Sequence, residues 1–76
     1  MSEETVNEIC KILNVNRLSF NKPDFNGCSL RFYAKKTNSI RYFRADSIKL
    51  LNKVAKKTNT WWQLSVECGY VEFHNN

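Results

Sequence analysis

The amino-acid sequence predicts a small α+β domain, in which two helices pack on one face of an antiparallel sheet. The chain has 76 residues, which is enough for one domain, so we expect residues 1–76 to fold as a single unit. Apolar residues recur at helical spacing in two segments and alternate with polar residues in the others. The expected order of elements is helix, three strands, helix and two strands, or α-β-β-β-α-β-β.

The first helix is expected over residues 3–14. Ser2 is a suitable N-cap, and Glu3 and Glu4 fall in the first turn, where the helix dipole favours acidic side chains. One apolar stripe follows at helical spacing and consists of Val6, Ile9, Cys10 and Leu13. This pattern is typical of a helix that buries one side.

The middle of the chain is expected to contribute three strands. A short strand over residues 17–21 is followed by a loop over residues 22–27, which holds the only proline. Residues 29–36 and 39–45 are rich in aromatic and β-branched residues and flank Thr37–Asn38, so they predict a hairpin. The expected opposed pairs are Leu30 with Ala45, Arg31 with Arg44, Phe32 with Phe43 and Tyr33 with Tyr42. One face of this hairpin then carries Arg31, Tyr33, Lys35, Tyr42 and Arg44.

A second helix and a second hairpin complete the prediction. The helix should begin at Asp46 or Ser47 and end near Lys57. Its inward residues are expected to be Ile48, Leu51, Val54 and Ala55, and its basic side carries Lys49, Lys53, Lys56 and Lys57. Alternation over residues 61–67 and again from residue 71 predicts a hairpin with a tight turn at Cys68–Gly69. This turn pairs Leu64 with Phe73 and Val66 with Val71. A bulge at Gly69 within one strand is the alternative.

The net charge of +5 is unevenly distributed along the chain. Residues 29–57 hold nine basic residues against one acid, whereas the rest of the chain carries a net charge of −3. Such a positive region attracts a polyanion or an acidic protein surface, and a solvated basic surface without a partner is the plainer interpretation. In the order of elements alone, the start of the chain is similar to double-stranded-RNA-binding domains. The segment 29–34 does not match the glycine and aromatic pattern of RNA-recognition motifs.

Basic and aromatic residues alternate on the polar face of the predicted middle hairpin. Aromatic rings stack on unpaired bases, while Arg and Lys neutralise the neighbouring phosphates. We therefore predict a non-enzymatic protein that binds nucleic acid, single-stranded or RNA. The residues expected to bind it are Arg31, Tyr33, Lys35, Tyr42 and Arg44, with Lys49 and Lys53 assisting. An ordinary cross-strand pair of tyrosines, covered by arginine stems, is the alternative interpretation.

Trp61 and Trp62 are neighbours in a predicted strand, so their side chains should point to opposite sides of the sheet. We expect Trp62 to lie in the core. Trp61 either packs over the end of the second helix or is exposed and anchors a partner.

Two other functions stay open on the sequence alone. A small phage or mobile-element inhibitor that docks on a host protein fits the size, the positive charge, and the ten Asn and eight Lys residues. A toxin-like endoribonuclease that uses His74, Tyr70 and arginines, with Gln63 opposite His74, is the second alternative. Because this single His has no matching motif, we expect no enzyme.

Metal, cofactor and membrane chemistry are not indicated. The three cysteines and one His lack the close spacing of structural zinc sites, so we expect neither a metal nor a cofactor. We expect Cys10, Cys28 and Cys68 to be buried thiols. The acidic start of the chain and its short apolar runs predict a cytoplasmic protein with no membrane partner. The oligomeric state is left open.

Overall fold

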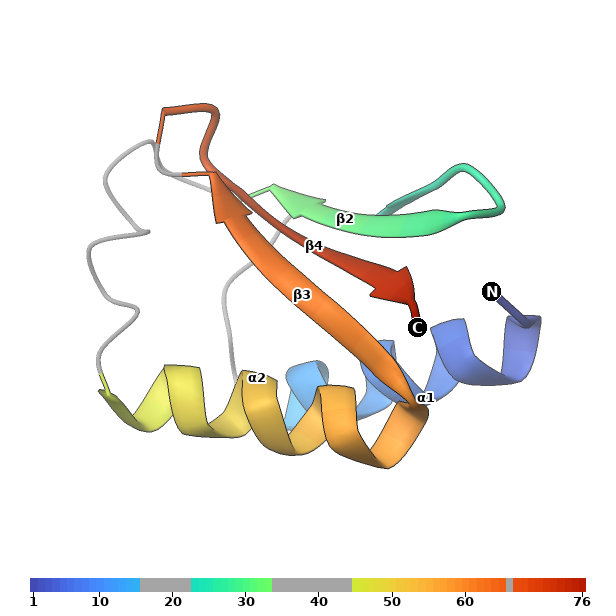
Figure 1. Ribbon diagram of the computed structural model, residues 1–76, viewed down its shortest axis with the longest axis horizontal. Helices are drawn as coiled ribbons and strands as arrows, with labels where there is room; N and C mark the ends of the chain where they lie inside the picture. Colours follow the sequence, from blue (N-terminus) through green and yellow to red (C-terminus); the bar gives the residue numbers. More distant parts are fainter. Residues whose placement is uncertain (16–22, 34–44, 66) are drawn as a thin grey trace.

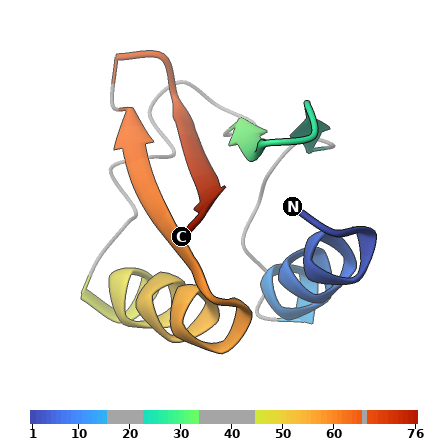
Figure 2. The same ribbon diagram turned by 45° about the vertical axis from the view of Figure 1, so that its right-hand side comes forward.

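The computed structural model describes residues 1–15, 23–33, 45–65 and 67–76, and within them it contains two helices and a four-stranded antiparallel sheet (Figure 1). The elements are α1 (Glu3–Val15), β1 (Asp24–Phe25), β2 (Ser29–Tyr33), α2 (Ala45–Thr58), β3 (Thr60–Ser65) and β4 (Tyr70–Asn75). The strand order in the sheet is β1-β2-β4-β3. Both helices lie on the same side of the sheet (Figures 1 and 2), which confirms the predicted α+β class.

Both helices begin close to the predicted positions. In α1 the N–H of Thr5 donates to Oγ of Ser2 at 3.1 Å, so Ser2 is the N-cap. The second helix, α2, begins at Ala45, one residue before the first predicted cap. Asn59 follows α2 with φ 54°, a left-handed conformation that Asn tolerates and that commonly ends a helix. One inward assignment in α2 is wrong, because Ile48 is 38% exposed.

The segment predicted as a loop contains the short strand β1, which pairs with β2. Asn26 organises the turn between them, because its Oδ1 accepts hydrogen bonds from the N–H groups of Cys28 (3.1 Å) and Ser29 (2.9 Å). Gly27 has φ 89°, a conformation that side-chain-bearing residues rarely adopt. An Asn-Gly pair is a strong hairpin signal, which explains the difference from the prediction. The strand predicted over residues 17–21 lies outside the described residues.

The predicted pairing of β2 with a following strand is wrong where it can be compared. At Leu30 and Arg31, β2 pairs with β1 on one edge and with β4 on the other. Leu30 therefore does not pair with Ala45, which instead begins α2, and the two partners of Arg31 are Asp24 and Glu72. The rest of the predicted hairpin falls in residues 34–44, which lie outside the described residues.

The second predicted hairpin is present as β3 and β4, but its register differs by two residues. Leu64 lies opposite Val71 rather than Phe73. Among the described residues of the turn, only Gly69 has positive φ (75°). The predicted two-residue turn needs positive φ at Cys68 as well, which a side chain disfavours. Because the shift is even, the described side chains of β3 and β4 keep their predicted faces, while Val66 lies outside the described residues.

The core lies between the sheet and the helices. Its buried cluster consists of Ile9, Leu13, Leu30, Phe32, Leu51, Val54, Val71 and Phe73. The rings of Phe32 and Phe73 meet edge to face, with their centroids 6.0 Å apart. As predicted, Trp62 packs against this cluster, and its Nε1 donates to Oδ1 of Asn52 on α2 at 2.9 Å.

The cysteines are less buried than predicted. Cys28 and Cys68 are exposed, because each lies in a hairpin turn, and Cys10 is half-buried against the core. Burial raises the pKa of the Cys10 thiol, and a backbone hydrogen bond offsets only part of this effect. Cys10 alone therefore acts as a small apolar residue of the kind that the sequence predicts.

Candidate functional site

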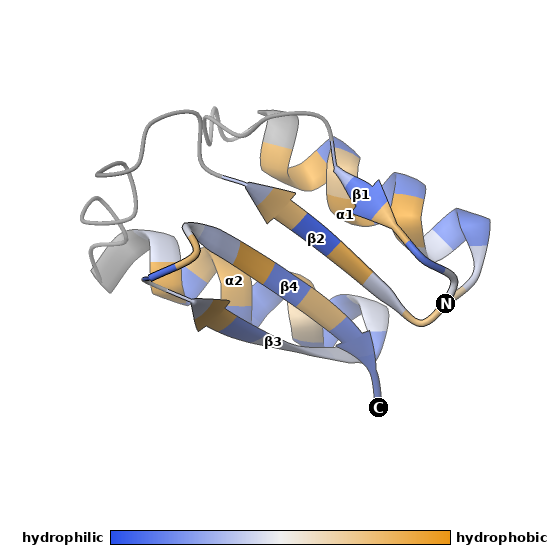
Figure 3. Cartoon of the chain, turned by 90° about the horizontal axis from the view of Figure 1, so that it is seen from above, coloured by the Kyte–Doolittle hydropathy of each residue, from blue (hydrophilic) through white to orange (hydrophobic). Residues whose placement is uncertain are grey.

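The side of the sheet that faces away from both helices carries aromatic and charged side chains; Figure 3 views the sheet from this side. Along β4, Val71 and Phe73 are fully buried on the helix side, so the residues between and beside them point the other way. Pairing with β2 and β3 adds residues from both neighbouring strands. We call the following set the outer sheet face: Arg31, Tyr33, Trp61, Gln63, Tyr70, Glu72 and His74.

Glu72 lies at the centre of the outer sheet face, although only 4% of its surface is exposed. Its Oε2 accepts a hydrogen bond from Nε of Arg31 at 2.6 Å and lies 2.6 Å from Nη2 of the same guanidinium. Its Oε1 lies 2.6 Å from Nε2 of His74 and accepts a bond from Nε2 of Gln63 at 3.2 Å. A buried carboxylate requires such partners, and here three strands supply them.

These contacts determine the charge states of the central pair. Burial alone raises the pKa of Glu72, but the hydrogen bond and charge of Arg31, helped by Gln63 and His74, outweigh it and lower the pKa. Hydrogen bonds to Tyr33 and Glu72 raise the pKa of Arg31. The carboxylate and the guanidinium are therefore both ionised at neutral pH.

Arg31 also holds two tyrosine rings. Its guanidinium carbon lies 4.0 Å from the ring centroid of Tyr70 and 5.9 Å from that of Tyr33. Its Nη1 donates to Oη of Tyr33 at 3.1 Å. The two rings meet edge to face at 5.7 Å. The guanidinium thus joins the tyrosines into one aromatic and cationic surface.

Trp61 and His74 form a second aromatic surface. Their rings are stacked, with centroids 4.3 Å apart and planes 14° from parallel. The indole Nε1 of Trp61 donates to the backbone oxygen of Asn75 at 3.1 Å, which fixes the orientation of the ring. Trp61 is 44% exposed and lies on the side of the sheet away from α2. Packing of Trp61 over the end of the second helix is therefore ruled out, and the exposed position is the one observed.

The residues predicted to bind nucleic acid are divided between two sides of the molecule. Arg31 and Tyr33 lie on the outer sheet face. Three others lie outside the described residues: Lys35, Tyr42 and Arg44. Lys49 and Lys53 are exposed on α2, on the opposite side of the sheet, so they are separate from Arg31 and Tyr33. The positive charge of Arg31 is already paired with Glu72, and a phosphate contact by Arg31 stays a prediction.

Glu72 was not among the predicted site residues, and Gln63, Tyr70 and His74 were predicted only as candidates for RNA cleavage. The signal that could have identified Glu72 is the strict alternation of β4, which places Glu72 on the same face as the rings of Tyr70 and His74. The predicted partner of Gln63 was wrong, because Gln63 lies opposite Glu72 rather than His74. Its Nε2 nevertheless lies 3.4 Å from Nε2 of His74, along the diagonal.

Within residues 1–15, 23–33, 45–65 and 67–76, no three His, Cys, Asp or Glu side chains are grouped so as to hold a metal ion. Neither described helix is long and apolar enough to cross a membrane. Comparison with protein-family models, curated proteins and solved structures finds no match.

Proposed function

We propose that this protein binds single-stranded nucleic acid, RNA in particular, through the outer sheet face and without catalysis. The observation that carries the proposal is the exposure of two aromatic surfaces, Trp61 at 44% and Tyr33 at 36%, on a sheet side that neither described helix covers. Each exposed ring offers a base a stacking surface worth about 1–3 kcal/mol. Duplex bases are already stacked, so the proposal is specific to unpaired bases.

Hydrogen bonds hold both aromatic surfaces in position before any ligand binds. Trp61 is held by its hydrogen bond to the backbone of Asn75 and by stacking on His74, and Tyr33 is held by its hydrogen bond from Arg31. Rings that are already oriented lose little rotational freedom when a base stacks on them, which favours affinity. The ion pair of Arg31 with Glu72 leaves little net charge at the centre of this face. Attraction for phosphates then depends on the other basic residues of the segment 29–57.

Fluorescence anisotropy with a labelled oligouridine of about ten nucleotides tests the proposal. Trp61→Ala should weaken binding by about 5- to 150-fold, the equivalent of one stacked base. Phe25→Ala is the matched control, because Phe25 is 42% exposed but shares the opposite side of the sheet with Leu30. The logarithm of affinity should fall with the logarithm of salt concentration by about 0.7 per phosphate neutralised. Equal binding by Trp61→Ala and wild type, or equal competition by duplex DNA, excludes this function.

RNA cleavage is a second candidate, favoured by the 2.6 Å contact between Nε2 of His74 and Oε1 of Glu72. A carboxylate that orients a His in this way can prepare its other ring nitrogen as a general base. His74 would take the proton of a ribose 2′-hydroxyl, whose oxygen then attacks the adjacent phosphorus, and the 5′-oxygen leaves with a proton from water, so that a 2′,3′-cyclic phosphate and a free 5′-hydroxyl are formed. Arg31, which binds the other oxygen of the same carboxylate, would stabilise the phosphate. Gel analysis of the same oligouridine separates the candidates: products that disappear in His74→Ala establish cleavage, and intact bound RNA excludes it.

A further inference from the structure

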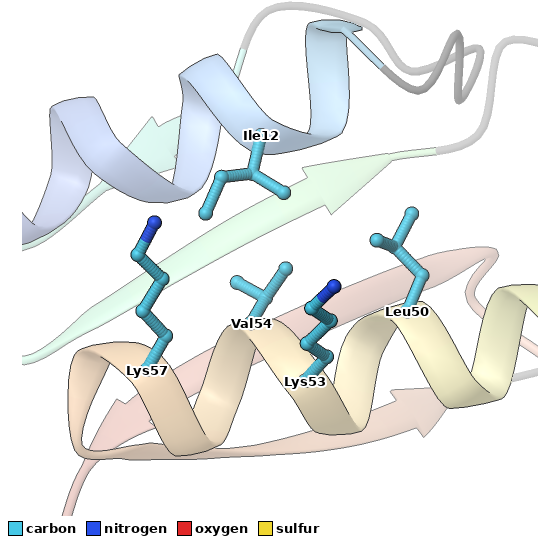
Figure 4. Close-up of a pocket in the computed structure, with 5 residues that line it drawn as sticks. All are labelled: Ile12, Leu50, Lys53, Val54 and Lys57. Carbon is cyan, nitrogen blue, oxygen red and sulfur yellow. The ribbon is translucent and has the colours of Figure 1, made fainter.

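A groove between the two helices is separate from the outer sheet face. It is lined by Ile12 of α1 and by Leu50, Lys53, Val54 and Lys57 of α2, and it has a volume of about 210 Å³ (Figure 4). Cofactor pockets occupy about 300–1,000 Å³, whereas a cavity of about 150 Å³ accepts one benzene ring. The groove is therefore sized for one large apolar side chain.

The chemistry of the groove is apolar below and positive at the rim. Ile12, Leu50 and Val54 supply the apolar lining, and the side chains of Lys53 and Lys57 extend beside it (Figure 4). The two lysines are four residues apart, so they lie one above the other on the same side of α2. Lys57 Nζ lies 3.0 Å from Oε1 of Glu8, in a pair whose members are 62% and 38% exposed. Lys53 has no ion-pair partner among the described residues.

We propose that this groove binds an acidic amphipathic helix of a partner protein. One large apolar side chain of the partner enters between Ile12 and Leu50, and two carboxylates four residues apart face Lys53 and Lys57. Binding of an amphipathic helix in a groove is a recurrent mode of peptide recognition, and its anchors repeat with this spacing. A nucleic-acid backbone would satisfy the lysines but has no apolar group for the lining, so charge and shape together favour a protein. The inference is independent of nucleic-acid binding by the outer sheet face.

Because Lys57 is paired with Glu8, the proposal predicts that one substitution tightens peptide binding and another weakens it. Glu8 competes with any partner carboxylate for Lys57, because both groups are exposed and their bond is readily exchanged. Glu8→Gln should therefore tighten binding by about two- to threefold. Lys53→Glu should weaken binding by about tenfold, because it replaces attraction with repulsion at the rim. Lys49→Glu is the matched control, since Lys49 is exposed on the same helix but does not line the groove.

The probe is a helical peptide with one leucine flanked by glutamates four residues apart, titrated to about 1 mM into ¹⁵N-labelled full-length protein and followed by NMR. Amide shifts should concentrate at Ile12, Leu50 and Val54, and a peptide with serine in place of the leucine should lose most of its affinity. Absence of these shifts overturns the proposal, as does equal weakening by Lys49→Glu and Lys53→Glu, which indicates unspecific attraction. Equal binding of the serine peptide, or shifts at the groove caused by oligouridine rather than peptide, also overturns it. Circular dichroism of each variant verifies that it is folded.

Discussion

Replacing Glu72 with glutamine tests whether its charge, or only its shape, holds the outer sheet face together. Glutamine is nearly isosteric and keeps an acceptor oxygen, but it loses the charge that faces Arg31 and His74. Hydrogen bonds to charged groups contribute about 1.5–3 kcal/mol. Because 34% of the Arg31 side chain is exposed, water replaces part of the lost interaction. We therefore expect the free energy of unfolding to fall by about 2 kcal/mol, near the lower end of that range.

Such a loss is large for a chain of this size. At about 0.05–0.15 kcal/mol per residue, the whole domain is stable by about 4–11 kcal/mol. The melting temperature should fall by roughly 8–16 °C, and urea unfolding followed by circular dichroism at pH 7 measures the free energy directly. Glu67→Gln is the matched control, because Glu67 is exposed in the turn between β3 and β4. This control should change stability by less than about 0.5 kcal/mol.

The effect of Glu72→Gln should depend on pH in one direction. Because folding lowers the pKa of Glu72, its ionised form stabilises the folded state above the ordinary Glu pKa of about 4.3. This contribution is lost as the pH falls through the lowered pKa, whereas glutamine does not titrate. The two proteins should therefore converge in stability in acid. An equal difference at pH 7 and in acid, or an unchanged melting temperature at pH 7, refutes the reasoning.

Three further predictions concern the helix cap, the core and the thiols. Ser2→Ala removes the N-cap of α1 and should lower the free energy of unfolding by about 1 kcal/mol in calorimetry, whereas Ser2→Asp should preserve it. Phe73→Ala empties a fully buried position and should cost about 3–5 kcal/mol, seen as unfolding at much lower urea concentration; a small change would mean that the core does not depend on this ring. With Ellman's reagent, Cys28 and Cys68 should react quickly and Cys10 slowly, because burial raises the Cys10 pKa and keeps its thiol protonated; three equal rates contradict the structure.

Local sequence patterns predicted where the helices begin and end better than they predicted which strands pair in the sheet. The helices expected over residues 3–14 and from residue 46 or 47 to 57 agree with α1 and α2 within two residues, because caps and apolar stripes are local signals. The pairing of β2 with β4 joins Arg31 to Glu72 across 41 positions of sequence. No periodicity within either strand specifies that contact, so proximity along the chain favoured the wrong partners for Leu30 and Arg31.

For the candidate site, the alternation of side chains along each strand predicted which residues share a face, but not which residues of neighbouring strands are in contact. Alternation places Arg31 with Tyr33, and it separates Trp61 from Trp62, whatever the strand order. The register of two paired strands determines which side chains lie opposite each other. In the hairpin of β3 and β4, the backbone conformations that the turn residues tolerate determine this register. Glu72 acquires its central position only when both neighbouring strands are in place. Its partners could therefore not be deduced from the sequence of β4 alone.

An ion pair, rather than apolar side chains, lies at the centre of the outer sheet face, and this choice of residues is relevant to the function of the face. Replacing a buried ion pair by apolar side chains of similar volume is often neutral or stabilising, so an ion pair here is weak evidence for stability as such. What Glu72 does accomplish is geometric. It fixes Arg31 across the ring of Tyr70, and it fixes His74 in the plane on which Trp61 stacks. Apolar residues would fill the same space without orienting the rings, and the proposed stacking on unpaired bases would gain affinity from rings that are already oriented.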